Sequence, residues 1–324
     1  MARRVGILGG IAVAAAAAMI LAPALGIVPL SDARSAVVLW SLRVPRVLLA
    51  FLAGAGLSLA GMTFQAIFRN PLVEPYTLGV SGGAAFGASL AIRAGWTFTL
   101  LGVSPIPLSA FAGALGSLAL VYGVAVAGRS FSTAVLLLAG AAMSFFFWSL
   151  IMVLQYLSDF MGSFRILRWL MGGVETVGYG GVLDILPFVL AGSAIILSYG
   201  RELNMLTVGE DLAASRGVSV GPVRGLLFAA STLMVGGVVA SCGPIGFVGL
   251  IAPHIGRRLV GTDHRILGPA TALFGGLFLL ACDTVARLVI APAEVPVGVL
   301  TALLGGPFFL WLLLRRPRAG GSLA

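Results

Sequence analysis

Residues 201–224 read RELNMLTVGEDLAASRGVSVGPVR and form the longest polar interruption in an otherwise apolar chain. Thr207 and Glu210 lie three residues apart, the spacing of a capping box in which each side chain binds the other's backbone N–H. Gly217 follows where a glycine would end the helix, because glycine tolerates a left-handed backbone. A helix of about nine residues is only roughly 13 Å long, too short to cross a bilayer. A short, capped and charged helix between two hydrophobic blocks is typical of a docking element.

The blocks on either side have the composition of a membrane protein. Of the 324 residues 59% are hydrophobic and only 10% are charged, and the mean hydropathy is +1.09. A soluble domain carries about 25% charged residues. Within a bilayer charge is costly, and every backbone polar group must be paired internally. We therefore predict an all-α integral membrane protein, a single transmembrane domain over residues 1–324 with the polar segment as a loop at about 203–224.

A transmembrane helix needs about 20 apolar residues, and about ten stretches approach that length. They are residues 5–29, 46–68, 76–94, 106–127, 134–157, 183–200, 225–242, 244–260, 268–290 and 296–314. Pro244, Pro253 and His254 interrupt the stretch at 244–260. The first stretch is too long for the apolar region of a signal peptide, so we expect it to stay as the first span.

Arginine sets the expected orientation. All twenty basic residues are arginine, and the net charge is +9. An even number of spans puts both termini on one side, and most of the arginines fall on that side, which predicts cytoplasmic termini and a cytoplasmic 201–224 segment. The placement of arginines on the cytoplasmic side of the spans thus accounts for the net positive charge. We therefore expect no nucleic-acid partner. The absence of lysine excludes the phosphate-binding loop G-x-x-x-x-G-K-[ST], so this chain does not hydrolyse ATP by that route.

Two arginine pairings are expected on the outer side. Residues 43–46 read RVPR at the start of the second span, where Pro45 suits a first helical turn. Arg43 and Arg46 are three apart and share a face, and either lipid phosphate or an acidic protein surface would hold them there. Asp283 and Arg287 are four apart late in the ninth span, which predicts an ion pair within that helix.

A cytoplasmic turn follows the eighth stretch. It contains Asp263, His264 and Arg265, which we expect to meet a partner or to cap a helix. His254 and His264 have no third ligand at metal-binding spacing, so we predict no metal site.

Six motifs cover nearly the whole chain in order. They are RVPR (43–46), QAIFRNPLVEP (65–75), LGVSGGA (78–84), GFVGLIAPH (246–254), TDHR (262–265) and EVPVGVLT (294–301). Together they resemble the permease subunits of bacterial ABC importers for iron-siderophores, haem and cobalamin.

The resemblance implies a ten-span, multi-pass subunit of the bacterial inner membrane that works as a homodimer, with the translocation path along the dimer axis. It implies two cytoplasmic ATPase subunits, which would bind ATP and magnesium, and a periplasmic or lipid-anchored substrate-binding protein. The chain itself would then be no enzyme and would need no cofactor, and membrane lipid would surround it.

The resemblance also assigns roles to residues. The loop at 209–221 would form the coupling element that enters a groove on the ATPase, with contacts and helix ends at Thr207, Gly209, Glu210, Asp211, Arg216 and Gly217. The arginines expected to face acidic residues of the binding protein are Arg43, Arg46 and Arg287.

The substrate is not fixed by these motifs. An iron-siderophore is favoured because such importers are abundant, with haem or a corrinoid such as cobalamin as alternatives. Two other classes stay open: an ion-coupled secondary transporter, which would need more buried acidic groups, and a membrane scaffold, which would tolerate charge reversal at Glu210 and Asp211.

Overall fold

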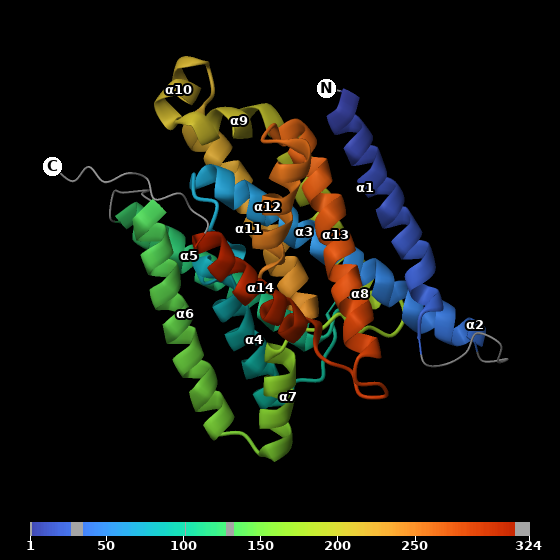
Figure 1. Ribbon diagram of the computed structural model, residues 1–324. Helices are drawn as coiled ribbons and strands as arrows, with labels where there is room; N and C mark the ends of the chain where they lie inside the picture. The colour runs from blue at the N-terminus through green and yellow to red at the C-terminus, as the bar shows by residue number, and fades with distance from the viewer. Residues whose placement is uncertain (1, 27–34, 101, 128–132, 315–324) are drawn as a thin grey trace.

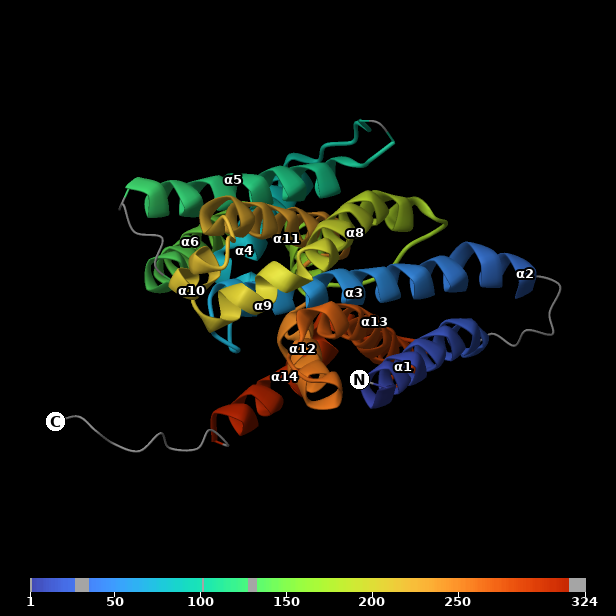
Figure 2. The ribbon, with the colours of Figure 1, turned by 90° about the horizontal axis from the view of Figure 1, so that it is seen from above.

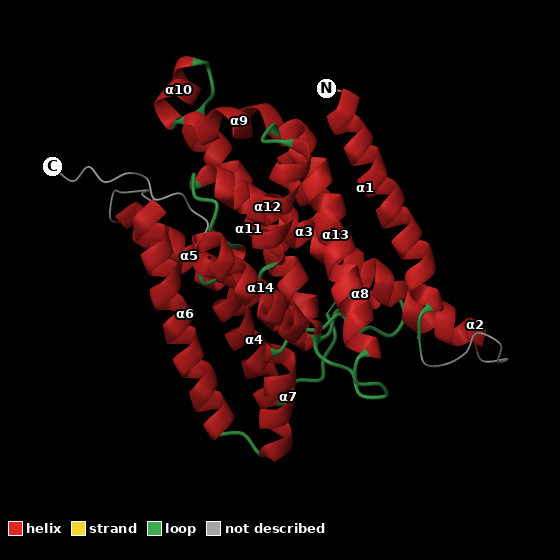
Figure 3. Ribbon diagram, viewed as in Figure 1, coloured by secondary structure: helices red, strands yellow, loops and turns green. Residues whose placement is uncertain are grey.

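The structure, a computed structural model, describes residues 2–26, 35–100, 102–127 and 133–314. Within these ranges the regular structure is helical, without a strand (Figure 3), as the composition predicted. The α-helices are α1 (Ala2–Leu21), α2 (Ser35–Val38), α3 (Val44–Ile67), α4 (Val80–Ala94), α5 (Pro105–Ala127), α6 (Thr133–Tyr156), α7 (Phe160–Leu170), α8 (Gly180–Ser198), α9 (Gly200–Val208), α10 (Glu210–Ser215), α11 (Val220–Cys242), α12 (Val248–Val260), α13 (His264–Leu288) and α14 (Val297–Leu314).

Each of the predicted stretches overlaps one of these helices. Seven helical stretches in the described part of the chain are long and apolar enough to cross a membrane. The helices α4, α12 and α14 are shorter, so the count of ten spans and the cytoplasmic termini stay predictions. Five arginines used in the orientation argument lie outside the described residues: Arg34, Arg129, Arg315, Arg316 and Arg318.

Helix α3 runs through the middle of the bundle (Figure 2). On one side it packs against α12 and α13, with α1 outside α13; on the other it packs against α8 and α11, with α5 beyond. Every residue from Ala53 to Ile67 is buried. Helices α9 and α10 lie with the start of α1 at one end of the molecule, here named the α10 end; α2 and the start of α3 lie toward the opposite, α2 end (Figure 1).

The second span begins earlier than predicted. Helical structure is already present from Ser35, and residues 39–43 form a π-helical turn that leads into α3. Pro45 lies in the first turn of α3, as predicted, but this turn continues an earlier helical segment. Pro45 has no N–H to donate to the carbonyl four residues earlier. That carbonyl, of Ser41, accepts a hydrogen bond from Gly178 N at 2.7 Å instead. The proline therefore modifies the helix without ending it.

Glycine permits the contacts of α3 with its neighbours. A Cβ added at Gly54 would lie 2.3 Å from the carbonyl oxygen of Gly275 in α13. One added at Gly61 would lie 2.1 Å from the carbonyl oxygen of Gly249 in α12. Within lipid no hydrophobic force drives helices together, so small residues that let backbones approach supply the packing. At these positions only a hydrogen atom fits.

A buried carboxylate holds the start of α12. Phe247, the residue before α12, has a left-handed backbone with φ +68, and its N–H donates to Glu74 Oε1. Such a backbone is unfavourable for a bulky residue, so it needs outside support. Glu74 comes from the loop between α3 and α4, which is how the motifs at 65–75 and 246–254 meet.

The first prediction concerns packing. We expect Gly61→Ala to lower the free energy of unfolding by about 2 kcal/mol, because the added methyl must push α3 away from α12. Gly116→Ala in α5 is the matched control, since a Cβ there meets nothing within 4 Å. It should change stability by less than about 1 kcal/mol. Unfolding in mixed micelles measures both; equal losses would contradict the close-contact role of Gly61.

The second prediction concerns pH. Burial raises the pKa of Glu74 to about 7, an effect that the Phe247 N–H partly opposes. The folded protein therefore holds this proton more tightly than the unfolded chain does. The resulting stabilisation is complete below the ordinary pKa of the carboxyl and is lost as pH rises toward 7, by about 3 kcal/mol.

Glu74→Gln keeps the acceptor for Phe247 N and removes the titration. Unfolding should therefore show a smaller loss of stability between pH 5 and pH 8 in this variant than in the original chain. Identical pH profiles would show that Glu74 does not carry the dependence.

Candidate functional site

The polar segment at 201–224 forms two short helices, not one helix of about nine residues. Helix α9 ends at Val208, and α10 has only six residues. Gly209 separates them with φ +156 and ψ +148, a conformation that essentially only glycine adopts. Gly217, with φ +84, ends α10 as predicted, and the next N–H, of Val218, donates to the Ala213 carbonyl at 3.0 Å.

The predicted capping box is wrong. Because Gly209 is the residue before α10, Thr207 belongs to the last turn of α9, where its hydroxyl donates to the Asn204 carbonyl at 2.8 Å. The Glu210 carboxylate instead accepts a hydrogen bond from Arg224 Nη1 at 2.8 Å. That ion pair fastens α10 to the first turns of α11.

Helix α10 projects from the bundle, as Figure 1 shows. The apolar side chains of Val208 and Leu212 are 67% and 43% exposed there. Asp211 and Arg216 are exposed beside them. Exposed apolar groups among charges on a projecting element are typical of a surface that a protein partner covers.

Helix α9 is anchored to the start of α13 through Asn204. Its Nδ2 donates to Asp263 Oδ1 at 2.8 Å, and its Oδ1 accepts from His264 N at 2.9 Å. Asp263 also caps α13 by accepting from Arg265 N at 3.1 Å. Hydrogen bonds from the Arg265 guanidinium hold the pKa of Asp263 well below its usual range. A movement of α9 must therefore act on α13.

The turn at 263–265 is thus less available to a partner than its sequence suggested. Asp263 is held by Asn204 and Arg265, and the His264 residue is only 4% exposed. Arg265 alone is exposed. Among the described residues no three or more His, Cys, Asp or Glu side chains are grouped to hold a metal ion.

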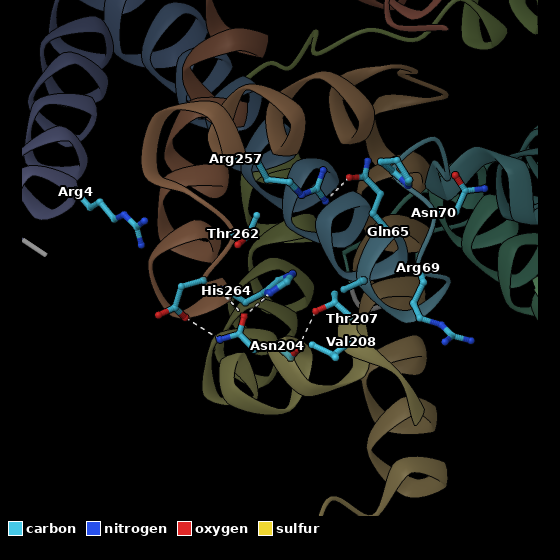
Figure 4. Close-up of a pocket in the computed structure, with 13 residues that line it drawn as sticks. Arg4, Gln65, Arg69, Asn70, Asn204, Thr207, Val208, Arg257, Thr262 and His264 are labelled. Atoms are coloured by element: carbon cyan, nitrogen blue, oxygen red, sulfur yellow. Dashed lines mark hydrogen bonds between the residues drawn. The ribbon is translucent and has the colours of Figure 1, made fainter. Parts of the chain in front are cut away.

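A second tie joins α3 to α12 at the same end. Gln65 Nε2 donates to the Gly249 carbonyl at 3.1 Å, and Arg257 Nη2 donates to Gln65 Oε1 at 2.6 Å. The two ties border a pocket of about 610 Å³, named here the basic pocket and drawn in Figure 4. Neither Asn204 nor Gln65 was singled out from the sequence, although Gln65 opens one of the motifs and Asn204 lies within the polar segment.

The three arginines expected to face outward lie together at the α2 end, but their charges are engaged within the chain. Arg43 is buried, and its Nη1 donates to the Pro23 carbonyl at 3.1 Å. Arg46 Nη2 lies 2.9 Å from Asp283 Oδ1, and Arg46 Nη1 lies 2.6 Å from Glu294 Oε2.

Asp283 is the centre of this cluster. Its side chain is 0% exposed, and Arg287 Nε lies 3.2 Å from its Oδ2, which confirms the predicted pair within α13. Arg46 comes from α3, so the cluster joins the two helices and offsets two guanidinium charges against two carboxylates. Arg43, Arg46, Arg287 and Glu294 also line an open pocket of about 470 Å³ at this end.

We expect Asp283→Asn to lower the free energy of unfolding by about 3 kcal/mol, because it leaves Arg287 without a buried counter-charge and Arg46 with one partner fewer. The control is Glu175→Gln, which breaks the exposed pair with Arg168. That loss should stay within about 0.5 kcal/mol. Denaturation in mixed micelles compares them, and a small effect at Asp283 would mean that the cluster does not stabilise the contact of α3 with α13.

Comparisons with known proteins identify the family of this chain. The chain matches the model of the FecCD transport family over residues 5–315. It is 42% identical over 286 residues to the cobalamin import system permease protein BtuC of Halobacterium salinarum, covering 86% of this chain and 74% of that protein. It is 39% identical over 277 residues to the hemin transport system permease protein HmuU of Yersinia pestis, covering 85% and 83%.

A solved structure shares the fold. It is described as an inward-facing conformation of a metal-chelate type ABC transporter, with a TM-score of 0.86 and 38% identity over 96% of this chain and 99% of that one. The family match over nearly all of the sequence and the shared helical bundle lead to one conclusion: this chain belongs to the FecCD transport family of ABC importer permeases.

Proposed function

We propose that this chain is the transmembrane permease subunit of an ATP-driven importer that moves a metal chelate into the cytoplasm, an iron-siderophore in preference to haem or a corrinoid. The observation that supports this most directly is the projecting α10, which exposes apolar and charged side chains. It follows directly after α9, which hydrogen bonds anchor to α13. Family membership and the long apolar helices make the chain a multi-pass protein of the bacterial inner membrane.

In this proposal the chain works as a homodimer with two ATPase subunits at the α10 end. Those subunits bind ATP and magnesium, and their closure pushes on α10. The ties from α9 to α13 and from α3 to α12 would carry that displacement into the spans. Differential binding of the partners to outward- and inward-open states would then drive transport.

A periplasmic or lipid-anchored binding protein would dock at the α2 end. Arg43, Arg46 and Arg287 line the open pocket there, and two carboxylates already offset much of their charge. An acidic side chain of the binding protein would compete with Glu294 for Arg46, because Glu294 is the more exposed of the two acidic partners. Such an exchange of charge pairs aligns the binding protein on the α2 end and speeds its association, more than it raises the affinity.

The coupling role is tested at Asp211, which is exposed and makes no ion pair within the described residues. Asp211→Arg should lower ATP-dependent chelate uptake at least tenfold in proteoliposomes that hold the ATPase and binding protein, equivalent to about 1.4 kcal/mol of lost coupling. Arg3→Glu, an exposed charge reversal on α1, should leave uptake unchanged. Membrane assembly should be normal in both variants. A non-transporting scaffold would show no uptake before any substitution.

Variants at Glu210 distinguish its ion pair with Arg224 from its proposed contact with the ATPase. Glu210→Arg breaks the pair with Arg224, and the double variant Glu210→Arg/Arg224→Glu restores it in reverse. We expect uptake to stay low in the double variant, because the ATPase would still meet the wrong charge. Full recovery would mean that Glu210 only holds α10 in place.

The source of energy is tested separately. Uptake that collapses with an uncoupler and survives ATP depletion would favour an ion-coupled carrier.

The substrate preference needs a separate measurement. Titration of the cognate binding protein against a ferric siderophore, haem and cobalamin should show tightest binding to the siderophore. Tighter binding of haem or cobalamin would replace that substrate and leave the permease role intact.

A further inference from the structure

Helix α3 ends in a Schellman motif, in which two N–H groups beyond the helix bind back to its last carbonyl groups. Arg69 N donates to the Ala66 carbonyl at 3.2 Å, and Asn70 N donates to the Gln65 carbonyl at 3.1 Å. The motif gives Arg69 a left-handed backbone, with φ +49. Glycine is the residue most often found at this position, because a side chain makes the left-handed conformation unfavourable. The chain therefore carries an arginine where the local structure favours glycine.

The side chain of Arg69 is exposed. Within the described part of the chain its guanidinium makes no hydrogen bond or ion pair. A positive charge at the end of a helix gains some energy from the helix dipole, but solvent and salt weaken that effect at an exposed site. An unfavourable backbone that presents an unpaired cation points to a contact outside the chain.

Arg69 lies beside the projecting α10. It lines the basic pocket together with Thr207 and Val208, the last two residues of α9. Val208 is 67% exposed, and α10 begins two residues later. In Figure 4 the Arg69 side chain extends on the side of Val208, away from Arg257 and His264. A protein that covers α10 and Val208 therefore also meets Arg69.

The charge of the basic pocket indicates the chemistry of that contact. Three arginines line it, Arg4, Arg69 and Arg257, against one acidic residue, Asp263. Both oxygens of Asp263 already accept hydrogen bonds from the Arg265 guanidinium. The mouth of the pocket next to α10 therefore has an excess of positive charge, which an acidic side chain of a partner complements.

We infer that the ATPase that docks on α10 also places an aspartate or glutamate side chain against Arg69, so that one partner contacts α10 and the end of α3 together. Since this contact presupposes an ATPase at the α10 end, it rests on the proposed function. Gln65, in the last turn of α3, donates to the Gly249 carbonyl next to the start of α12. Movement of the ATPase would then act on the central helix directly, as well as through the anchor of α9 at Asn204.

The test is binding of the purified cognate ATPase to full-length variants of the chain in neutral detergent. Arg69→Gly suits the left-handed backbone and removes the guanidinium, so it should keep or raise the melting temperature of the chain alone while weakening ATPase binding about tenfold. Arg69→Lys keeps the charge and should retain most of the binding. Arg3→Gln, the matched control, removes a charge from an exposed position of α1 at the same end and should leave binding unchanged.

Charge reversal identifies the acidic partner. Arg69→Glu should weaken binding more than Arg69→Gly does, because it places two carboxylates together. Exposed aspartates and glutamates around the docking groove of the ATPase are then changed one at a time to arginine. One of these changes should restore binding to the Arg69→Glu chain, and failure of all of them to do so would contradict the inferred ion pair.

The possible failures are distinguishable. Equal binding of the ATPase to the original chain and to Arg69→Gly would overturn the inferred contact and leave the proposed function intact. If Arg69 holds an anionic lipid in place of the ATPase, native mass spectrometry of nanodiscs should also show less phosphatidylglycerol retained by Arg69→Gly. A fall in the melting temperature of Arg69→Gly would assign the arginine to the stability of α3 and overturn the contact. Failure of the unaltered chain to bind the ATPase would overturn the proposed function as well.

Discussion

The whole arrangement depends on how closely the backbone of α3 approaches its neighbours. Gly54 meets Gly275 of α13, and Gly61 meets Gly249 of α12, at positions where a methyl group would overlap a carbonyl oxygen. Lipid offers helices no hydrophobic reason to associate, so contact of this kind must supply both cohesion and register. Once α3 is fixed, the helices around it have few alternative positions.

The same helix joins the two ends of the molecule. Arg46 in its first turn takes part in the charge cluster around Asp283, and Gln65 in its last turn binds Arg257 and Gly249. About 19 residues of helix separate them, or roughly 29 Å. Helix α13 runs beside it with Asp263 at one end and Asp283 near the other. The two packed helices are tied to each other at the α2 end, whereas at the α10 end α3 is tied to α12 and α13 to α9. They therefore form a rigid unit between the proposed docking surfaces.

The sequence predicted the fold class, the position of nearly every helix and the polar docking segment, because hydropathy and glycine spacing act locally. It predicted the pair of Asp283 with Arg287 for the same reason. It did not predict that Arg46 shares Asp283, that Glu210 pairs with Arg224, or that Asn204 binds Asp263 and His264. These partners lie far apart along the chain or across a helix break, and no periodic pattern records them.

The failed capping box has a simple physical cause. Thr207 and Glu210 have the correct spacing, but the box requires a continuous helix start, and Gly209 adopts a backbone that ends one helix before the next begins. Similarly, the outward arginines oppose the charge bias and were expected to be held by lipid phosphate or by an acidic surface of another protein. Internal carboxylates and carbonyl groups hold them instead, which the composition could not reveal.

The break at Gly209 has a consequence for how such a protein can change over evolution. The interactions that hold α9 to the bundle all precede this glycine, and the side chains that α10 exposes all follow it or lie beside it. Substitutions on the exposed face of α10 therefore leave the anchor of α9 untouched. A family member could adapt this short helix to a different ATPase while keeping the same membrane core, so that partner choice and fold are inherited separately.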